Sequence, residues 1–329
     1  MTVLRIEDEN LEPNEFGLLP DLSRQWGMTF VRFRSDLPLA GSPERTTWRS
    51  MLETDDGRLF VLEKIPSRWL SRKLRIAALL HQLHNFGLNR LSSYQPDCNG
   101  EFIPLIRHGL WQLCPFVEGV ALNRPEYAMD GWRGDAAAGF LIRFQKVCEQ
   151  CSRFSDRSVF SIVFYIRNLI AALTREAPQV AKRYRPFMAH LETQFFPIHD
   201  RLPIGFCHGD FHPLNMIWGK RSIRTVIDWE FCGFKPEMYD LANLLGCLGM
   251  EDPRSLNGPL VHRLVSRMKA SGRFADESWE ALPDLILAIR FAWLNEWMRK
   301  NDRSMIRLEA DYMQLLLDSR LGLINLSCS

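Results

Sequence analysis

Three side chains that carry oxygen, Asp210, Asn215 and Asp228, lie close together in a stretch of sequence that is otherwise mainly apolar. Turn-forming residues separate them and short β-prone runs flank them, so we expect a loop between two short strands and a polar group at the end of the next strand. Such a loop can hold Asp210 beside a hydroxyl group while Asn215 and Asp228 converge on one cation, because Mg²⁺ prefers oxygen ligands. Phosphoryl transfer needs such groups, since the protein there mainly positions reactants and neutralises charge.

These residues belong to three motifs, which are HGDFHPLN at 208–215, IDWE at 227–230 and YDLA at 239–242. In residue types and in spacing, the motifs resemble those of the aminoglycoside phosphotransferase and choline kinase superfamily, whose members are related to the protein kinases. Every polar position of the family's catalytic loop is present, so the match is specific. The resemblance implies a phosphotransferase that uses ATP and Mg²⁺.

The resemblance also implies roles for four residues. Asp210 would be the catalytic base that orients the acceptor hydroxyl. Asn215 and Asp228 would be the ligands of Mg²⁺. Asp240 would brace the catalytic loop from the helix that follows it.

Two histidines, His208 and His212, flank Asp210 in the loop. Histidine acts as a general base in many sites, and it also braces loops through hydrogen bonds of the imidazole. Because the resemblance gives the role of base to Asp210, bracing is the favoured interpretation. A direct part in catalysis stays open for both histidines.

The composition indicates a packed globular protein without a strong bias in charge. Of the 329 residues, 46% are hydrophobic and 24% are charged, which suits one large domain or two modest ones. The net charge of +2 is too small to predict a general attraction to nucleic acid or membranes. No apolar run has the length of a membrane span, and the first residues do not resemble a secretory signal. We therefore expect a cytoplasmic protein with reduced cysteines, and the oligomeric state is not predicted.

The N-terminal part predicts a small sheet. A turn at 55–57 between the apolar runs 48–53 and 59–65 indicates a hairpin. In a kinase-like protein, the loop before this hairpin, with Gly41 and Ser42, would cover the nucleotide phosphates. One glycine does not make a phosphate loop, so an ordinary surface turn stays an alternative.

The family usually places a lysine or an arginine directly after an apolar pair on the second strand of this hairpin. Here Glu63 has that position and Lys64 comes one residue later. Since strand side chains alternate between faces, the two cannot both point into the nucleotide site. The next segment, 71–83, has helical spacing but lacks the glutamate that normally pairs with the lysine.

Two hypotheses follow for the phosphate contact. In the favoured one the ion pair is inverted: Glu63 faces a cation of the helix, Arg75 or Lys73, and that cation contacts phosphate. In the other, Lys64 points inward through a β-bulge and Glu63 is solvated.

A strand over 109–119 resembles the hinge strand of the family. Main-chain groups at Leu113, Pro115 and Phe116 would bind the edge of adenine while apolar side chains contact its face. An ordinary core strand is the alternative.

From about residue 120 the pattern changes to long helical segments, including three predicted helices within 256–317. The sequence and the resemblance together predict an α+β, two-lobed protein-kinase-like fold. Residues 1–118 would form a β-rich N-lobe that covers the nucleotide. Residues 119–329 would form a helical C-lobe with the catalytic loop, the metal site and the acceptor pocket. A group of polar and aromatic residues lines either that pocket or, as we favour, the core: Arg290, Trp293, Glu296 and Trp297.

The leading functional hypothesis is transfer of the γ-phosphate of ATP to a hydroxyl group of a small molecule, such as a sugar, an amino alcohol or a hydroxy amino acid. A nucleotide-binding pseudokinase or regulatory module is a second hypothesis, motivated by Glu63. A protein Ser/Thr kinase of the same fold is a third. The acceptor and the choice between ATP and GTP are not predicted.

Overall fold

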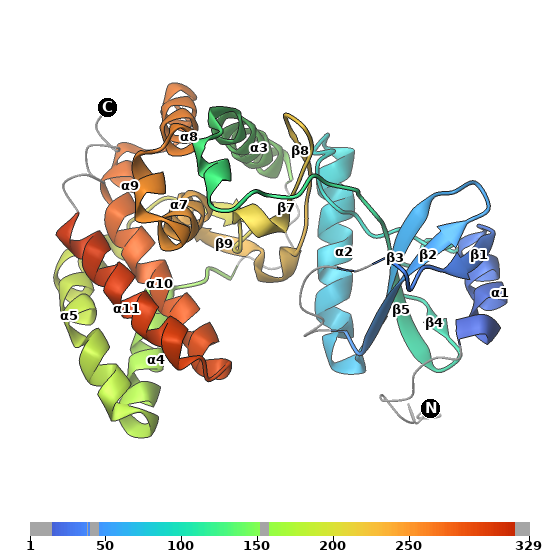
Figure 1. The fold of residues 1–329 in the computed structure, drawn as a ribbon, viewed down its shortest axis with the longest axis horizontal. Coiled ribbons are helices and arrows are strands. Elements are labelled where there is room, and N and C mark those ends of the chain that lie inside the picture. The colour runs from blue at the N-terminus through green and yellow to red at the C-terminus, as the bar shows by residue number, and fades with distance from the viewer. Residues whose placement is uncertain (1–14, 38, 40–45, 152–157, 320–329) are drawn as a thin grey trace. The chain divides into compact units, whose positions relative to one another are not determined.

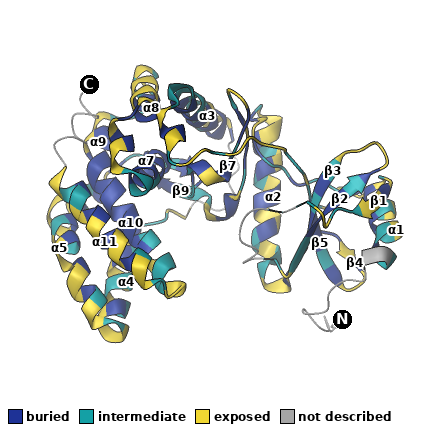
Figure 2. Cartoon of the chain, viewed as in Figure 1, coloured by how far each residue is buried: buried dark blue, intermediate teal, exposed yellow. Residues whose placement is uncertain are grey.

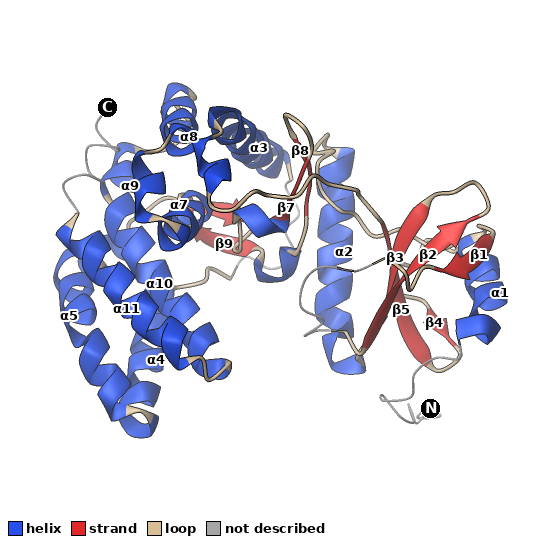
Figure 3. Ribbon diagram, in the orientation of Figure 1, coloured by secondary structure: helices blue, strands red, loops and turns tan. Residues whose placement is uncertain are grey.

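The computed structural model describes residues 15–37, 39, 46–151 and 158–319. The chain divides into two compact units, Met1–Glu118 and Gly119–Ser329, here called the N-terminal and C-terminal units. Figure 1 shows their elements along the chain, and Figure 3 shows that strands dominate the first unit while helices dominate the second. The predicted α+β class is confirmed.

The N-terminal unit is built on a five-stranded antiparallel sheet with the order β1-β2-β3-β5-β4. Its strands are β1 (Phe30–Phe33), β2 (Trp48–Thr54), β3 (Leu59–Ile65), β4 (Leu105–Ile106) and β5 (Gly109–Pro115). The predicted hairpin is present as β2 and β3. Gly57 in its turn has φ of 80°, a conformation that glycine adopts without steric cost.

Two helices cover opposite faces of this sheet (Figure 1). Helix α1 (Glu15–Trp26) packs Leu18 and Leu22 into one apolar core with Phe60 and Leu62 of β3. Helix α2 (Leu70–Asn85) follows a short 3-10 turn, η1 (Ser67–Trp69), and matches the helix predicted at 71–83.

The C-terminal unit is mostly helical and contains two small antiparallel ribbons. The ribbons are β6 (Ile204–Cys207) with β9 (Gly233–Pro236), and β7 (Met216–Trp218) with β8 (Ile223–Val226). The longer helices are α3 (Gly131–Gln150), α4 (Ile162–Glu176), α5 (Pro178–Gln194), α7 (Tyr239–Glu251), α8 (Pro259–Ala270), α10 (Leu282–Arg299) and α11 (Arg303–Asp318). The short helices and 3-10 turns are η2 (Glu126–Met129), α6 (Phe196–His199), η3 (Pro213–Asn215), η4 (Trp229–Phe231), η5 (Pro253–Asn257) and α9 (Asp276–Glu280).

The expectation of three helices within 256–317 is corrected, because the structure has four there. The additional one, α9, has five residues, too few to show a helical period in the sequence. Only Ala281 separates it from α10, whose first turn carries Pro283.

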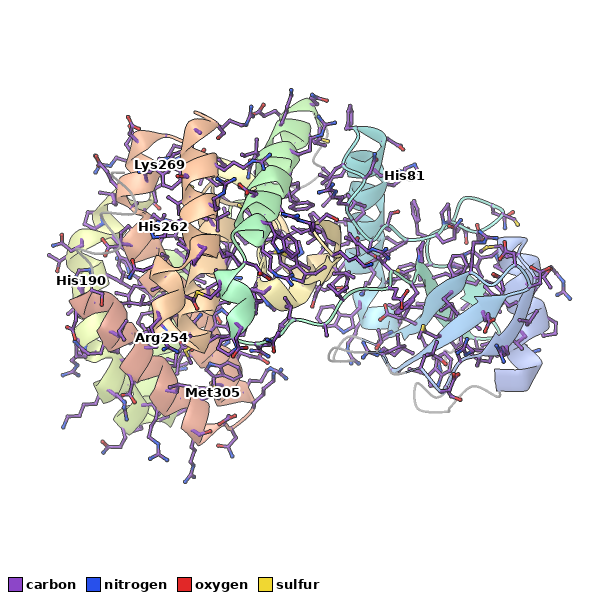
Figure 4. The ribbon with its side chains drawn as sticks, turned by 45° about the horizontal axis from the view of Figure 1, so that its top comes forward. His81, His190, Arg254, His262, Lys269 and Met305 are labelled. Atoms are coloured by element: carbon purple, nitrogen blue, oxygen red, sulfur yellow. The ribbon has the colours of Figure 1, made fainter. Side chains whose placement is uncertain are left out.

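Burial in the C-terminal unit concentrates on α7 and α10 (Figure 2). Close packing at α3 and α8 depends on Gly134, because a Cβ there would lie 2.0 Å from the carbonyl oxygen of Leu260. Helix α5 is joined to α10 by His190, which Figure 4 labels on α5. Its Nε2 lies 2.7 Å from Oδ1 of Asp284 on α10. In the described part of the chain, no helix combines the length and apolar character needed to cross a membrane.

Candidate active site

The first motif, residues 208–215, forms a loop between β6 and β7, as predicted. The strand pairing of β7 with β8 continues one step beyond the strands, since the N–H of Ile227 donates to the carbonyl of Asn215 at 2.9 Å. Asp228 follows directly. The hairpin therefore brings Asn215 and Asp228 to the same end of one ribbon, although twelve residues of sequence separate them.

Asp228 has a left-handed backbone, with φ of 59° and ψ of 64°. Residues other than glycine seldom adopt this conformation, but aspartate tolerates it better than most. The conformation turns the chain sharply from β8 into η4. A backbone outlier of this kind is typical of functional sites.

Asp210 is held by the side chain of Asn215. The amide Nδ2 of Asn215 donates to Oδ2 of Asp210 at 3.0 Å and to the main-chain oxygen of Asp210 at 2.9 Å. With its nitrogen so engaged, the Asn215 amide presents its oxygen on the opposite side. That arrangement suits a hard cation, which takes amide and carboxylate oxygens as ligands.

His212 lies beside the same carboxylate, with Nε2 at 3.6 Å from Oδ2 of Asp210. Burial by itself raises the pKa of Asp210, but the neighbouring His212, His208 and Asn215 outweigh it and hold the pKa below its ordinary value. Asp210 is therefore ionised at neutral pH and can accept a hydrogen bond or a proton.

His208 is completely buried. Its Nε2 lies 2.9 Å from the carbonyl oxygen of Ile227, and its Nδ1 accepts the N–H of Asp210 at 3.2 Å. Burial lowers the pKa of His208 to about 4, so the ring is neutral at pH 7. We place its proton on Nε2, which can then donate to the carbonyl oxygen of Ile227. These contacts tie the loop to the end of β8, which is bracing geometry.

Asp240, in the first turn of α7, binds the main chain of the catalytic loop. Its carboxylate accepts the N–H groups of His208 at 2.7 Å and of Gly209 at 2.8 Å. Burial raises the pKa of Asp240 to about 6, against the lowering effect of these two N–H donors. Gly209 has φ of 84°, and a Cβ there would lie 2.1 Å from the carbonyl oxygen of Phe231, so this position requires glycine.

The aromatic residue between the two histidines of the loop, Phe211, is also anchored. Its ring is fully buried and stacks on Phe140 of α3, with 5.6 Å between centroids. Together with the polar contacts, this packing fixes the loop at both main chain and side chain.

Sequence reasoning missed two polar residues that support the loop. Asn243 of α7 is buried, and its Nδ2 donates to the carbonyl of Phe211 at 3.4 Å. Lys235 of β9 is buried, and its ammonium donates to the carbonyl of Phe231 at 2.6 Å. The available signal was position, since Asn243 lies one helical turn after Asp240 and so shares its face.

Helix α10 contributes one aromatic contact to the loop. Trp293 packs its ring edge-to-face with His212 at 5.8 Å, and its indole N–H donates to Asn243 at 3.1 Å. Glu296, by contrast, pairs with Arg299 and Lys300 on the outer side of the same helix. The helix thus carries one residue toward the catalytic loop.

Arg290 and Trp297 belong to a buried network instead of a surface pocket. Arg290 is 1% exposed and binds the carboxylate of Glu309 on α11 with two N–H groups, one of them at 2.7 Å. The indole of Trp297 donates to the same carboxylate at 3.0 Å. Arg290 and Trp297 therefore have the contacts of core residues, the interpretation that the sequence analysis favours.

In the N-terminal unit, the register separates the two charged residues of β3. Glu63 pairs with Gln112 of β5, and Gln112 Nε2 donates to Glu63 Oε2 at 3.1 Å. Lys64 pairs with Trp111 and points to the opposite face. Arg75 lies exposed on α2. The predicted phosphate-covering residues Gly41 and Ser42 lie outside the described residues.

The predicted hinge residues lie at the end of β5. Leu113 is buried in the core beneath α1, and its carbonyl accepts the N–H of Gln95 at 2.8 Å. Phe116 donates its N–H to the carbonyl of Leu59 at 2.9 Å. Pro115, between them, is exposed. These contacts engage two of the main-chain groups that the adenine interpretation invokes.

Among the described residues, no cluster of three or more His, Cys, Asp or Glu side chains is arranged to hold a metal ion. A magnesium site does not need such a cluster. Mg²⁺ keeps several waters and is typically bound by one or two protein ligands together with substrate phosphates. The pair Asn215 and Asp228 fits this requirement.

Comparisons with known proteins give the family and the fold. Residues 45–281 match the model of the phosphotransferase enzyme family, APH. No curated protein matches the chain significantly in the sequence comparison.

Several solved structures share the fold. Amicoumacin kinase hAmiN, solved with AMP-PNP, Ca²⁺ and its ligand Ami, has 14% identity and a TM-score of 0.66, over 93% of this chain and 94% of that one. The GDP complex of aminoglycoside 2'-phosphotransferase-IIIa has 14% identity and a TM-score of 0.64, over 94% and 100%. Macrolide 2'-phosphotransferase MphH from Brachybacterium faecium has 13% identity and a TM-score of 0.60, over 92% and 98%. The two-lobed kinase-like fold predicted from the sequence is thereby confirmed, and since the family match spans most of the chain, the chain belongs to the phosphotransferase enzyme family.

Proposed function

We propose that this protein transfers the γ-phosphate of ATP to a hydroxyl group of a small molecule. The observation that carries the proposal is the ionised Asp210, held by Asn215 at the end of the β7–β8 hairpin where Asp228 also lies. A carboxylate at that place can orient an acceptor hydroxyl and take its proton as the bond to phosphorus forms.

Asn215 and Asp228 would hold Mg²⁺ through the amide oxygen and the carboxylate. The ion, when bound, would neutralise the charge of the transferred phosphates. Asp228, with its left-handed backbone, follows β8 at the same end of the hairpin, and the hydrogen bond from Asn215 holds the Asp210 carboxylate next to the first of these two proposed ligands.

The two histidines act on Asp210 in different ways. His208 is a positioning residue, because both of its nitrogens bind main-chain groups and its ring is buried and neutral. His212 lies next to the carboxylate and lowers its pKa. A direct contact of His212 with the substrate phosphate fits its place at the partly exposed side of the loop.

The N-terminal unit, residues 1–118, would supply the nucleotide contacts. We assign the edge of the base to the main chain from Pro115 to Val117, with Phe116 and Leu113 fixing the end of β5. Gly41 and Ser42 would cover the phosphates.

The acceptor is proposed only as a class. The solved relatives include kinases of amicoumacin, aminoglycosides and macrolides. From these relatives we infer that the acceptor is a small molecule with a hydroxyl group, such as a sugar, an amino alcohol or a hydroxy amino acid. Neither nucleic acid nor a membrane is part of the proposal, and the proposed location is the cytoplasm.

The test is a coupled assay of ADP release with Mg²⁺ and ATP over a panel of hydroxyl-bearing metabolites and antibiotics. We expect turnover on at least one acceptor and, for Asp210→Asn, a loss of about a thousandfold or more in kcat with ATP affinity kept. Unchanged turnover in that variant would remove the mechanism. Tight ATP binding without turnover on any acceptor would indicate a pseudokinase, and transfer to protein acceptors would indicate a protein kinase.

A further inference from the structure

The two charged residues at the end of β3 lie on different faces of the N-terminal sheet. Lys64 is aligned with Trp48 of β2 and Trp111 of β5, whose rings touch edge-to-face at 5.7 Å. Trp111 belongs to the core that α1 covers. Because paired residues of antiparallel strands share a face, Lys64 lies on the α1 side of the sheet.

Glu63 lies on the other side, which faces α2. Its aligned neighbours are Arg49 of β2 and Gln112 of β5. Gln112 is 2% exposed and donates to the Glu63 carboxylate at 3.1 Å. The carboxylate is therefore fixed in the middle of the sheet, with a cation on one neighbouring strand and an amide on the other.

Helix α2 adds a buried cation to this face. Lys73 is 6% exposed, and it is the only basic side chain of α2 that is buried. The pKa of the Cys114 thiol indicates where Lys73 lies. Burial raises this pKa to about 12. The charge of Glu63 raises it as well, and the charge of Lys73 lowers it. Both charged groups are thus within electrostatic range of one sulfur atom on the α2 side of β5.

Arg75 does not share this position. Two residues along an α-helix correspond to a rotation of about 200°, so Arg75 points away from the side on which Lys73 is buried. The structure accordingly has Arg75 exposed.

The charges on this face suit an anion. A buried ammonium is costly unless a carboxylate compensates it, and Glu63 is the acidic residue of β3 on the face against which Lys73 is buried. Arg49 is a second cation on the same face, and one of its N–H groups donates to the carbonyl of Leu39 at 3.0 Å. Together the two cations and Glu63 carry one net positive charge, a sign that suits a polyphosphate.

We propose that Lys73 on α2 contacts the α- and β-phosphates of the nucleotide, that Glu63 on β3 positions it, and that Arg49 is the second phosphate contact. The acid and the base have then exchanged places between strand and helix, relative to the arrangement that the resemblance implies. This inference rests on the proposed function, since it names the phosphate contact of the same nucleotide site.

The first experiment measures equilibrium binding of MgATP to the full chain by calorimetry. Lys73→Met is expected to weaken binding by about tenfold or more, because a charge-assisted hydrogen bond is lost. Arg49→Met is expected to weaken it less. Arg75→Met, on the same helix, and Lys64→Met, on the same strand, test the competing cations and are expected to stay within about twofold of the wild type. Loss of binding in Lys64→Met with normal binding in Lys73→Met would overturn the inference.

The second experiment exchanges the charges. Glu63→Lys and Lys73→Glu each place like charges together and should each weaken binding by about a hundredfold, whereas the double variant should recover most of the loss. Thermal unfolding of every variant separates loss of binding from loss of the fold. A double variant that folds but does not bind MgATP counts against the inference, even where a single variant fails to fold.

The two proposals fail in different ways. If the wild type does not bind MgATP, the proposed function is wrong. If the wild type binds MgATP and Lys73→Met binds it equally well, the function stands and the role of Lys73 is wrong.

Discussion

At the scale of single residues, the catalytic loop depends on an imidazole that stays neutral. Nδ1 of His208 accepts the N–H of Asp210, and that contact is lost when the nitrogen is protonated. The pKa of His208 is lowered to about 4 by burial, whereas an unperturbed histidine titrates near 6.5. Between these two values the unfolded chain binds a proton that the folded chain does not.

We therefore expect acid to destabilise the fold through His208. A group whose pKa is lower in the folded state favours folding above the unfolded pKa, and its contribution is lost as the pH falls toward the folded pKa. From the values of 6.5 and about 4, the loss amounts to about 3 kcal/mol, with most of the change between these pH values. Urea unfolding over a series of pH values measures it, and His208→Gln should flatten the dependence. An equal slope in that variant would assign the effect to other groups.

The residues of the loop were predictable from the sequence because they are contiguous. Asn215 and Asp228 flank one hairpin and Asp210 lies in the loop just before it, so local turn and strand signals place them together. The sequence could not decide whether Trp293 lies in a pocket or in the core. Its contact with His212 depends on how α10 packs, about 80 residues farther along the chain. No local pattern encodes that packing.

At the scale of elements, helices α10 and α11 are joined by a fully buried ion pair. Arg290 and Glu309 are 1% and 0% exposed as side chains, and the indole of Trp297 donates to the same carboxylate. A buried ion pair gains little over an apolar pair, but removing one partner leaves an uncompensated charge.

Glu309→Gln is therefore expected to lower the free energy of unfolding by about 3 to 5 kcal/mol. The double variant Arg290→Met with Glu309→Leu should be much closer to the wild type, because it removes both charges and keeps apolar volume. Chemical denaturation of Arg290→Met, of Glu309→Leu and of their double variant gives the coupling free energy. A coupling near zero would contradict the role of this pair in joining α10 to α11.

Helix rotation sets the limit of sequence reasoning at this scale. The sequence identified α2 and its basic residues, yet it could not choose between Lys73 and Arg75, because only the position of the sheet tells which of two opposite sides of a helix is buried. The faces of Glu63 and Lys64 were open in the same way, since a shift of one residue in the register exchanges them.

At the scale of the whole molecule, the sequence predicted the α+β class from local periodicity, which changes from strand-like to helical along the chain. The acceptor was out of reach for a physical reason. Its pocket depends on side chains from several helices that converge in space, and the same fold serves many substrates.

Nucleotide binding should stabilise the whole chain in a metal-dependent way. A ligand that binds only the folded protein adds about 2.7 kcal/mol at a hundredfold excess over its Kd, which corresponds to a rise of several degrees in Tm. If Asn215 and Asp228 hold the metal, ATP with Mg²⁺ should raise the Tm more than ATP with EDTA. Asp228→Asn should respond to ATP with Mg²⁺ as the wild type does with EDTA, whereas Asp276→Asn, on the exposed first turn of α9, should behave as the wild type. A rise with ATP that Mg²⁺ does not increase would contradict the metal ligands while leaving nucleotide binding intact, because the two contributions come from different side chains.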